Sequence, residues 1–170
     1  MKLVTFRASV EASARLGIVQ SDQVIDVGLL GAAFGEEFPT SMLDLIDLGP
    51  AGLAAVEDAL VEADGRWPIG SALPIENVTL LAPIPRPRKN IFGIGLNYVE
   101  HVAESSKSLD TSKDLPTQPV IFSKPPTTVI GPGAAIEHNK ALTQQLDWEV
   151  ELTVIIGRTA RKVGEDTAMS

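Results

Sequence analysis

The sequence contains no cysteine, and this absence excludes several kinds of protein at once. A chain without cysteine has no disulfide framework, no thiolate metal site and no cysteine nucleophile. Histidine is almost as scarce, with two residues in 170. Any reaction that needs an imidazole base therefore has only His101 and His138 to draw on.

Long apolar runs and an excess of positive charge are missing as well. No apolar run approaches the ~18 residues of a membrane span, and residues 1–17 carry acids and arginines where a signal peptide has its apolar stretch. The net charge is −8, and residues 1–82 account for it with 4 basic and 12 acidic side chains. Nucleic acids and anionic membrane surfaces attract basic proteins, so we expect neither as a partner. The sequence predicts a soluble, cytoplasmic protein.

What is present favours a folded protein of mixed class. Hydrophobic residues make up 44% of the chain and charged residues 21%, a balance typical of globular proteins. We expect an α+β fold with two domains, a small one over residues 1–75 and a larger one over residues 76–170. The alternating prolines Pro83, Pro85 and Pro87 predict a stiff extended connector close to this boundary.

Short apolar clusters separated by tight turns predict the strands of both domains. Helix signals follow the first three clusters, with a weak capping box at Ser41 and a second start at Pro50. After the connector, residues 96–105 have the pattern of a helix. The predicted strands are residues 2–7, 14–20, 23–27, 77–84, 90–95, 119–124 and 146–157.

The last of these strands, residues 146–157, places three carboxylates on one face. Side chains two residues apart share a face of a strand, so Asp147, Glu149 and Glu151 point the same way. Their mutual repulsion is relieved if their pKa values rise or if a cation lies among them. Carboxylate oxygens favour Mg²⁺, Mn²⁺ or Ca²⁺ over zinc. The alternative is a solvated face of an edge strand.

A second candidate for chemistry lies in the predicted helix over residues 96–105. His101 and Glu104 are three residues apart, which places them side by side on one face, with Tyr98 one turn earlier. A glutamate beside an imidazole orients it and raises its basicity, the arrangement of a general base that activates water. The alternative is an ordinary surface ion pair on a helix.

The remaining motifs are weaker. Gly93 and Gly95 begin a dinucleotide-binding pattern, but Tyr98 stands where its third glycine belongs, so these glycines are better explained by a close backbone approach or a tight turn. Lys124, at the end of a predicted strand, offers a positive charge to an anionic substrate or is a plain surface lysine. His138 lies in a polar loop and is expected to be structural or exposed.

Three segments in this order resemble the fumarylacetoacetate hydrolase family, which includes acylpyruvate hydrolases and related decarboxylases and isomerases. They are NIFGIGLNYVEHVAE, PVIFSKPPTTVIGPGAAI and LDWEVELTVIIGR. The resemblance runs from about residue 75 to Ser170, and the preceding part resembles the small N-terminal domain of bacterial members. It implies a catalytic domain built as a mixed β-roll, of which this chain holds the N-terminal part, and a homodimer.

The resemblance also implies roles for matching residues. Glu149 and Glu151 correspond to two carboxylates that bind a divalent ion, usually Mg²⁺, with Mn²⁺ or Ca²⁺ as alternatives, and the third metal carboxylate of the family would lie beyond Ser170. His101 and Glu104 correspond to the dyad that activates water, and Asp147 supports the site without binding the ion. Lys124 and Tyr98 are the expected substrate-binding residues.

The implied function is a metal-dependent hydrolase that cleaves a carbon–carbon bond in an acylpyruvate- or fumarylacetoacetate-like 1,3-dicarbonyl substrate. A cation that chelates such an anionic substrate polarises its carbonyl and stabilises the enolate that forms as the bond breaks. Decarboxylation or isomerisation of a 2-oxo dicarboxylate is the alternative within the family. A non-catalytic binding or assembly role is the alternative from another class.

Overall fold

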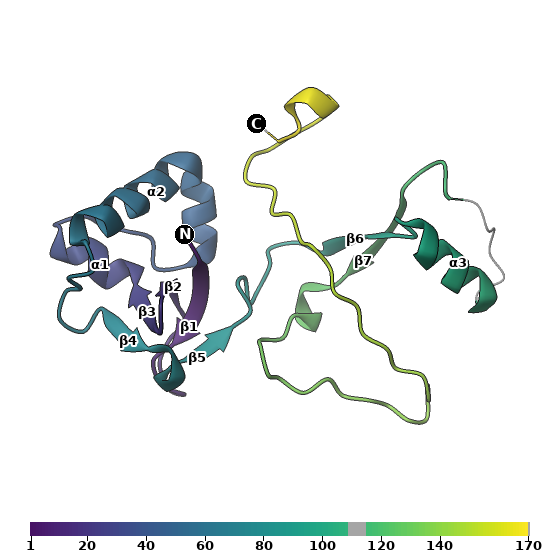
Figure 1. Ribbon diagram of the computed structural model, residues 1–170, viewed down its shortest axis with the longest axis horizontal. Helices are drawn as coiled ribbons and strands as arrows, with labels where there is room; N and C mark the ends of the chain where they lie inside the picture. Colours follow the sequence, from purple (N-terminus) through teal and green to yellow (C-terminus); the bar gives the residue numbers. More distant parts are fainter. Residues whose placement is uncertain (109–114, 170) are drawn as a thin grey trace. The chain divides into compact units, whose positions relative to one another are not determined.

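The computed structural model of the protein describes residues 1–108 and 115–169, with the backbone alone for residues 104–108. Contacts along the chain divide it into two units, Met1–Ile84 with Gly131–Ser170, and Pro85–Ile130. Both helices and strands are present (Figure 1), so the predicted α+β class is confirmed. None of the helices in the described ranges combines the length and apolar character that a membrane crossing requires.

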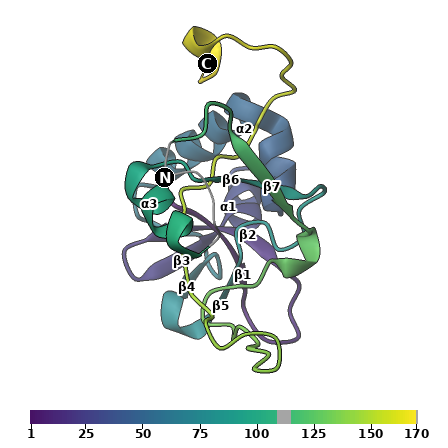
Figure 2. The same cartoon turned by 90° about the vertical axis from the view of Figure 1, so that its right-hand side faces the viewer.

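A five-stranded antiparallel sheet forms the centre of the first unit, with its strands in the order β4-β3-β2-β1-β5. Figure 2 labels these five strands. The first three strands form the predicted meander, because a tight turn at Ser21 and Asp22 joins two runs of alternating apolar residues. Ser21 adopts φ 53°, as such turns require. The strands are β1 Leu3–Arg7, β2 Arg15–Gln20, β3 Gln23–Asp26, β4 Ala72–Pro74 and β5 Thr79–Leu81.

Two helices pack against this sheet, α1 (Val27–Ala33) and α2 (Met42–Ala63). Ser41 caps α2 as predicted, since its side chain accepts a hydrogen bond from the Asp44 backbone N–H at 3.2 Å. The helix is kinked at Gly49, which has φ 61° and ψ −151°, and it resumes at Pro50. The predicted second helix start at Pro50 is therefore confirmed, and it lies directly after the kink inside α2.

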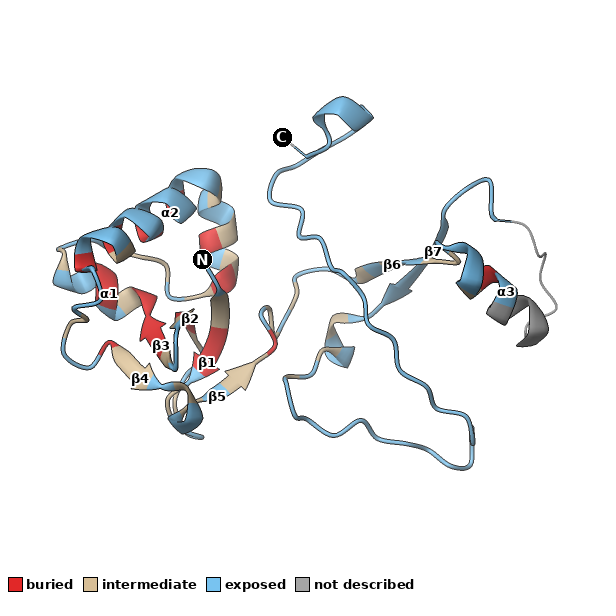
Figure 3. Ribbon diagram, viewed as in Figure 1, coloured by how far each residue is buried: buried red, intermediate tan, exposed pale blue. Residues whose placement is uncertain are grey.

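The hydrophobic core lies between the sheet and these helices, where Figure 3 shows most of the buried residues. Leu16 and Ile18 of β2 pack there with Val27 of α1 and with Leu45 and Val56 of α2, each no more than 1% exposed. Among the described side chains after residue 84, the one that is fully buried is Val102. The burial of apolar surface that stabilises the fold is thus concentrated in Met1–Ile84.

The second unit is built on a two-stranded antiparallel sheet of β6 (Ile91–Gly95) and β7 (Val120–Lys124). Helix α3 (Val99–Ser108) lies between these two strands in the sequence. Gly93 faces the ring of Phe122 across the pair so closely that a Cβ would collide with it. The predicted close approach is therefore confirmed at this glycine, and it is made by an aromatic side chain. Short 3₁₀ turns complete the described elements, at Ile75–Asn77, Pro126–Thr128 and Glu165–Thr167.

The predicted strand over residues 146–157 is wrong for this structure. These residues form neither helix nor strand, and all of them are exposed. A strand exists only when its backbone pairs with a neighbouring strand, and no described segment of the chain is paired with this stretch. The alternation of apolar and acidic residues remains, but nothing among the described residues covers its apolar side.

Candidate active site

His101 lies in the first turn of α3 and is half-buried. The ring of Tyr98 stacks on its imidazole, with 5.2 Å between the ring centroids and 26° between the planes. The carbonyl of Tyr98 accepts a hydrogen bond from the Val102 backbone N–H at 3.1 Å, which makes Tyr98 the residue at which the helix begins. The structure therefore brings together two of the predicted site residues at the start of one helix.

Glu104, the predicted partner of His101, belongs to the same helix. Its backbone lies within Val99–Ser108, so the two residues have the spacing that places them on one helical face. The side chain of Glu104 lies outside the described residues. The helical spacing of the dyad agrees with the sequence analysis, and the contact between the two side chains stays a prediction.

Lys124 is the last residue of β7 and lies opposite Ile91 in the register of the pair. Its side chain is exposed, and its Nζ lies 5.4 Å from the centroid of the Phe122 ring. A lysine ammonium over an aromatic face is held there by the ring's negative quadrupole. Lys124 thus carries a positive charge at the surface of the second unit.

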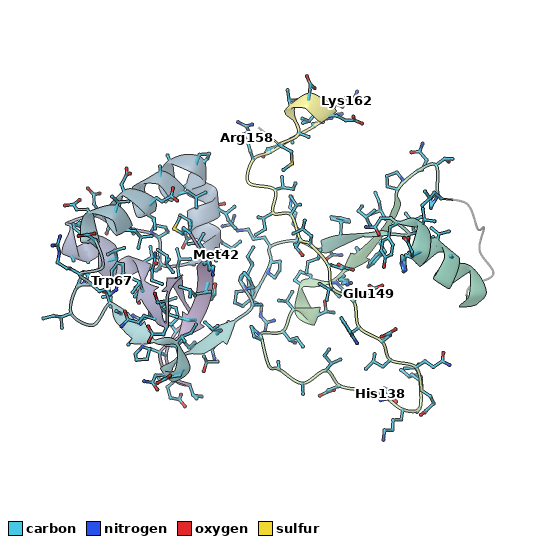
Figure 4. The ribbon with its side chains drawn as sticks, in the orientation of Figure 1. Met42, Trp67, His138, Glu149, Arg158 and Lys162 are labelled. Carbon is cyan, nitrogen blue, oxygen red and sulfur yellow. The ribbon has the colours of Figure 1, made fainter. Side chains whose placement is uncertain are left out.

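The predicted metal ligands Glu149 and Glu151 lie in the irregular stretch of the first unit, where Figure 4 labels Glu149. Both side chains are exposed. Asp147 accepts a hydrogen bond from the backbone N–H of its neighbour Trp148 at 2.8 Å. Within the described part of the chain, no group of three or more histidine, aspartate or glutamate side chains is placed to hold a metal ion.

The chemistry of these two glutamates nonetheless fits a hard divalent cation. Carboxylate oxygens are the donors that Mg²⁺ and Mn²⁺ prefer, and Mg²⁺ is commonly bound by one or two carboxylates with water and substrate oxygens in the other positions. His138 is exposed, and its Nε2 lies 2.9 Å from the carbonyl oxygen of Thr143. The structural role expected for His138 agrees with this contact.

A shallow pocket of about 330 Å³ lies in the second unit, lined by residues 94–97 and 115–120. This pocket was not predicted from the sequence, although Pro116 and Pro119 indicate a restricted backbone in residues 115–120. Leu96 lines the pocket with φ 52°, a left-handed backbone that costs a leucine energy. Such conformations cluster at functional sites, so the pocket marks the turn between β6 and α3 as a candidate binding surface.

Known proteins resemble the chain over its whole length. The family model described as "Fumarylacetoacetate (FAA) hydrolase C-terminal" matches residues 90–170. The mitochondrial oxaloacetate tautomerase fahd2 of Xenopus laevis is 33% identical over 99% of this chain and 48% of its own. The oxaloacetate tautomerase YisK of Bacillus subtilis is 39% identical over 55% of this chain and 30% of its own.

The similarity extends to three-dimensional structure. The crystal structure of an HpcE-type protein from Mycobacterium smegmatis superposes with a TM-score of 0.52 at 28% identity, covering 82% of this chain and 41% of that one. The chain spans about half the length of the curated relatives that it matches from end to end. Sequence and fold agree, and the chain belongs to the fumarylacetoacetate hydrolase family.

Proposed function

We propose that the protein moves a proton on a 2-oxo acid, and that its reaction is the keto–enol interconversion of an oxaloacetate-like 2-oxo dicarboxylate. The relatives that match this chain across 99–100% of its length include several named oxaloacetate tautomerases. The structural observation that supports the proposal is the half-buried imidazole of His101, stacked against Tyr98 at the start of α3.

His101 is the base in this proposal. In the keto form, the carbon between the 2-oxo group and the distal carboxylate carries the acidic proton, which moves to a ring nitrogen of His101. The protonated imidazole then gives a proton back to the 2-oxo oxygen, directly or through water, so the enol forms without any change in composition and His101 is restored. An imidazole suits this task because it accepts and returns protons near neutral pH. The carboxylate of Glu104, one turn along the helix, would orient the ring.

Lys124 would bind one carboxylate of the substrate. The substrate carries two negative charges and the chain has a net charge of −8, so local positive charge is needed where the substrate binds. The ammonium of Lys124 is exposed at the end of β7 and belongs to the same unit as His101. Charge-assisted hydrogen bonds of this kind are stronger than neutral ones.

Glu149 and Glu151 would hold a divalent cation, Mg²⁺ or Mn²⁺. When it is bound, the cation supplies polarisation of the 2-oxo and carboxylate oxygens and so stabilises negative charge on the enolate. A bound cation would also relieve the repulsion between these two carboxylates, which are two residues apart in an acidic protein.

Carbon–carbon bond hydrolysis of an acylpyruvate is the second candidate. The spacing of His101 and Glu104 on α3 favours it, because an imidazole supported by a carboxylate activates water for attack on a carbonyl. The proton of water goes to His101, the hydroxyl adds to the acyl carbonyl, and the bond to the pyruvate enolate breaks. Protonation of that enolate gives pyruvate.

The experiment measures the rates of three reactions with the purified protein in the presence of Mg²⁺ or Mn²⁺. Decay of the enol absorbance of oxaloacetate, above the spontaneous rate, would support the tautomerase proposal. Release of pyruvate from an acylpyruvate, with the enol of oxaloacetate decaying no faster than it does without protein, would favour hydrolysis instead. Release of carbon dioxide from oxaloacetate would favour decarboxylation. If none of the three rates exceeds the protein-free rate, the enzymatic proposal fails and the binding or assembly role is left. A homodimer and a cytoplasmic location remain predictions of the sequence.

A further inference from the structure

The contact between Tyr98 and His101 has the geometry of a stacked aromatic pair. Their ring centroids are 5.2 Å apart, within the range of about 4.5–7 Å that offset-stacked rings prefer. The planes differ by 26°, which keeps the face of one ring toward the other. The phenol ring therefore covers one face of the imidazole and leaves the ring edge, with its two nitrogens, available for chemistry.

The backbone fixes the starting point of both side chains. Tyr98 directly precedes α3 and His101 lies in its first turn, and the contact between their rings shows that the two side chains meet there. The hydrogen bond from the Val102 N–H to the Tyr98 carbonyl closes the first helical turn around them. Val102 is 2% exposed, so this turn is anchored by a buried side chain. The stack is thus formed by two residues that are close in sequence, beside a hydrogen-bonded helical turn.

We infer that Tyr98 is a positioning residue for His101, an inference that rests on the proposed function of His101 as the proton-transfer base. An imidazole on the first turn of a helix has several accessible rotamers, and each of them points its nitrogens in a different direction. A ring stacked on one face removes rotamers that would occupy the same space. Holding a catalytic group in one orientation before the substrate arrives raises the rate of the step it performs.

This inference differs from the substrate contact expected for Tyr98 from the sequence. A substrate contact would be made by the phenol hydroxyl, which donates or accepts a hydrogen bond. Stacking is a property of the ring, and Tyr98 is 54% exposed, so it has no packing role in a core. Phenylalanine keeps the ring and lacks the hydroxyl, whereas leucine lacks both, so the two substitutions separate the two roles.

The composition of the chain makes the stack directly observable by proton NMR. Tyr98 is the one tyrosine in the sequence and His101 is one of two histidines. We expect a nuclear Overhauser effect between the tyrosine ring protons and one imidazole, and its loss in His101→Asn but not in His138→Asn. The imidazole C–H resonances of His101 should be shifted upfield by the ring, should stay so in Tyr98→Phe, and should move downfield in Tyr98→Leu.

Steady-state kinetics test the positioning role itself. We expect Tyr98→Leu to lower kcat about tenfold with KM unchanged, since misplacing a catalytic group by an ångström costs up to about 100-fold. Tyr98→Phe, the conservative variant that keeps the ring, should recover most of the kcat lost in Tyr98→Leu, with no rise in KM. A raised KM in Tyr98→Phe, or an unchanged kcat in Tyr98→Leu, would overturn the inference. Thermal unfolding of both variants should match the wild type, because the hydrophobic core lies in Met1–Ile84.

The two proposals fail in different experiments. If no Overhauser effect links Tyr98 to His101, the stack is absent in solution and the positioning role falls, whatever the activity of the protein. If the stack is observed but His101→Asn keeps full activity, the proposed function of His101 falls, and the positioning role falls with it.

Discussion

Asp26 is the acidic residue that is buried among the described residues of the first unit. It is 2% exposed, its Oδ1 accepts a hydrogen bond from the Leu29 N–H at 3.0 Å, and its Oδ2 lies 2.6 Å from Nη1 of Arg15. One carboxylate thus caps helix α1 and pairs with a cation that lies 5.3 Å from the centroid of the Phe6 ring. A buried charge of this kind is tolerated because the opposite charge of Arg15 balances it, although Oδ2 has no hydrogen-bond partner among the described groups.

Replacing this carboxylate should destabilise the fold strongly. We expect Asp26→Ala to lower the free energy of unfolding by about 3 kcal/mol, because it leaves Arg15 without its partner and α1 without its cap. Asp58→Ala, at an exposed position of α2, is the matched control and should change stability by less than about 0.5 kcal/mol. Urea denaturation followed by circular dichroism measures both, and equal losses in the two variants would contradict this account of Asp26.

The two glutamates at 149 and 151 are tested by their response to a cation. A ligand that binds only the folded state stabilises it, by about 2.7 kcal/mol at 100 times its dissociation constant. We expect Mg²⁺ or Mn²⁺ to raise the Tm of the wild type, and the double variant Glu149→Gln with Glu151→Gln to lose that rise. Glu137→Gln, in the same irregular stretch, should keep it. A rise that survives the double substitution would place the cation elsewhere.

Among the elements, α2 shows how one residue sets the direction of a helix. Gly49 lies inside it with φ 61° and ψ −151°, a backbone conformation that is essentially restricted to glycine, and Pro50 restarts the helix with its fixed φ. Open space surrounds the position where a Cβ would stand. The cost of a side chain at position 49 is therefore conformational and involves no collision.

Substitution at the kink should accordingly be costly. We expect Gly49→Ala to lower the free energy of unfolding by about 1–3 kcal/mol, the usual cost of forcing a residue with a Cβ into such a conformation. Leu48→Ala, next to it and 55% exposed, should cost much less. Thermal or urea unfolding distinguishes them. A neutral Gly49→Ala would mean that α2 can run through position 49 without the kink.

Several elements were predictable because their signals are local. The meander of β1, β2 and β3 follows from alternation and a two-residue turn, and the start of α2 follows from the Ser41 cap. Helix α1 was missed because its first residue, Val27, completes an apolar strand pattern. The available signal was Asp26, whose side chain caps the helix.

Other features depend on partners that a local pattern does not contain. Residues 146–157 have the alternation of a strand, yet strand formation needs a neighbouring backbone, which this stretch lacks among the described residues. The site could be predicted only in part, because some of its features also depend on residues that are distant in sequence. The spacing of Tyr98 and His101 predicted a shared helical face, whereas the pocket beside Leu96 depends on a loop that is distant in sequence. How Glu149 and Glu151 relate to His101 stays a prediction.

At the scale of the whole molecule, stability and the proposed chemistry belong to different parts of the chain. Both hydrophobic clusters consist of residues from Met1–Ile84, whereas the proposed site residues all follow Pro85. Beyond residue 84, large apolar side chains such as Phe92, Trp148 and Leu152 are exposed. The described apolar side chains beyond residue 84 are therefore mostly outside the two hydrophobic clusters.

The first 84 residues should therefore fold without the rest. We expect a fragment of residues 1–84 to unfold in one cooperative transition, since it contains the complete five-stranded sheet, both helices and the core between them. A fragment of residues 85–170 is the matched comparison and should show no such transition, because a two-stranded sheet alone is at best marginally stable. Circular dichroism during heating measures both. Loss of cooperativity in the first fragment would contradict this division.

The proposed function depends on one imidazole, and the chain supplies its own control in the second. His101→Asn should lower kcat for the oxaloacetate keto–enol interconversion by about 100- to 10,000-fold, the usual contribution of a general base. His138→Asn should leave kcat within about twofold, because that exposed residue contacts only a loop carbonyl among the described groups. The decisive measurement is the ratio of the two variants' kcat values. A ratio near one would contradict the assignment of His101 as the base.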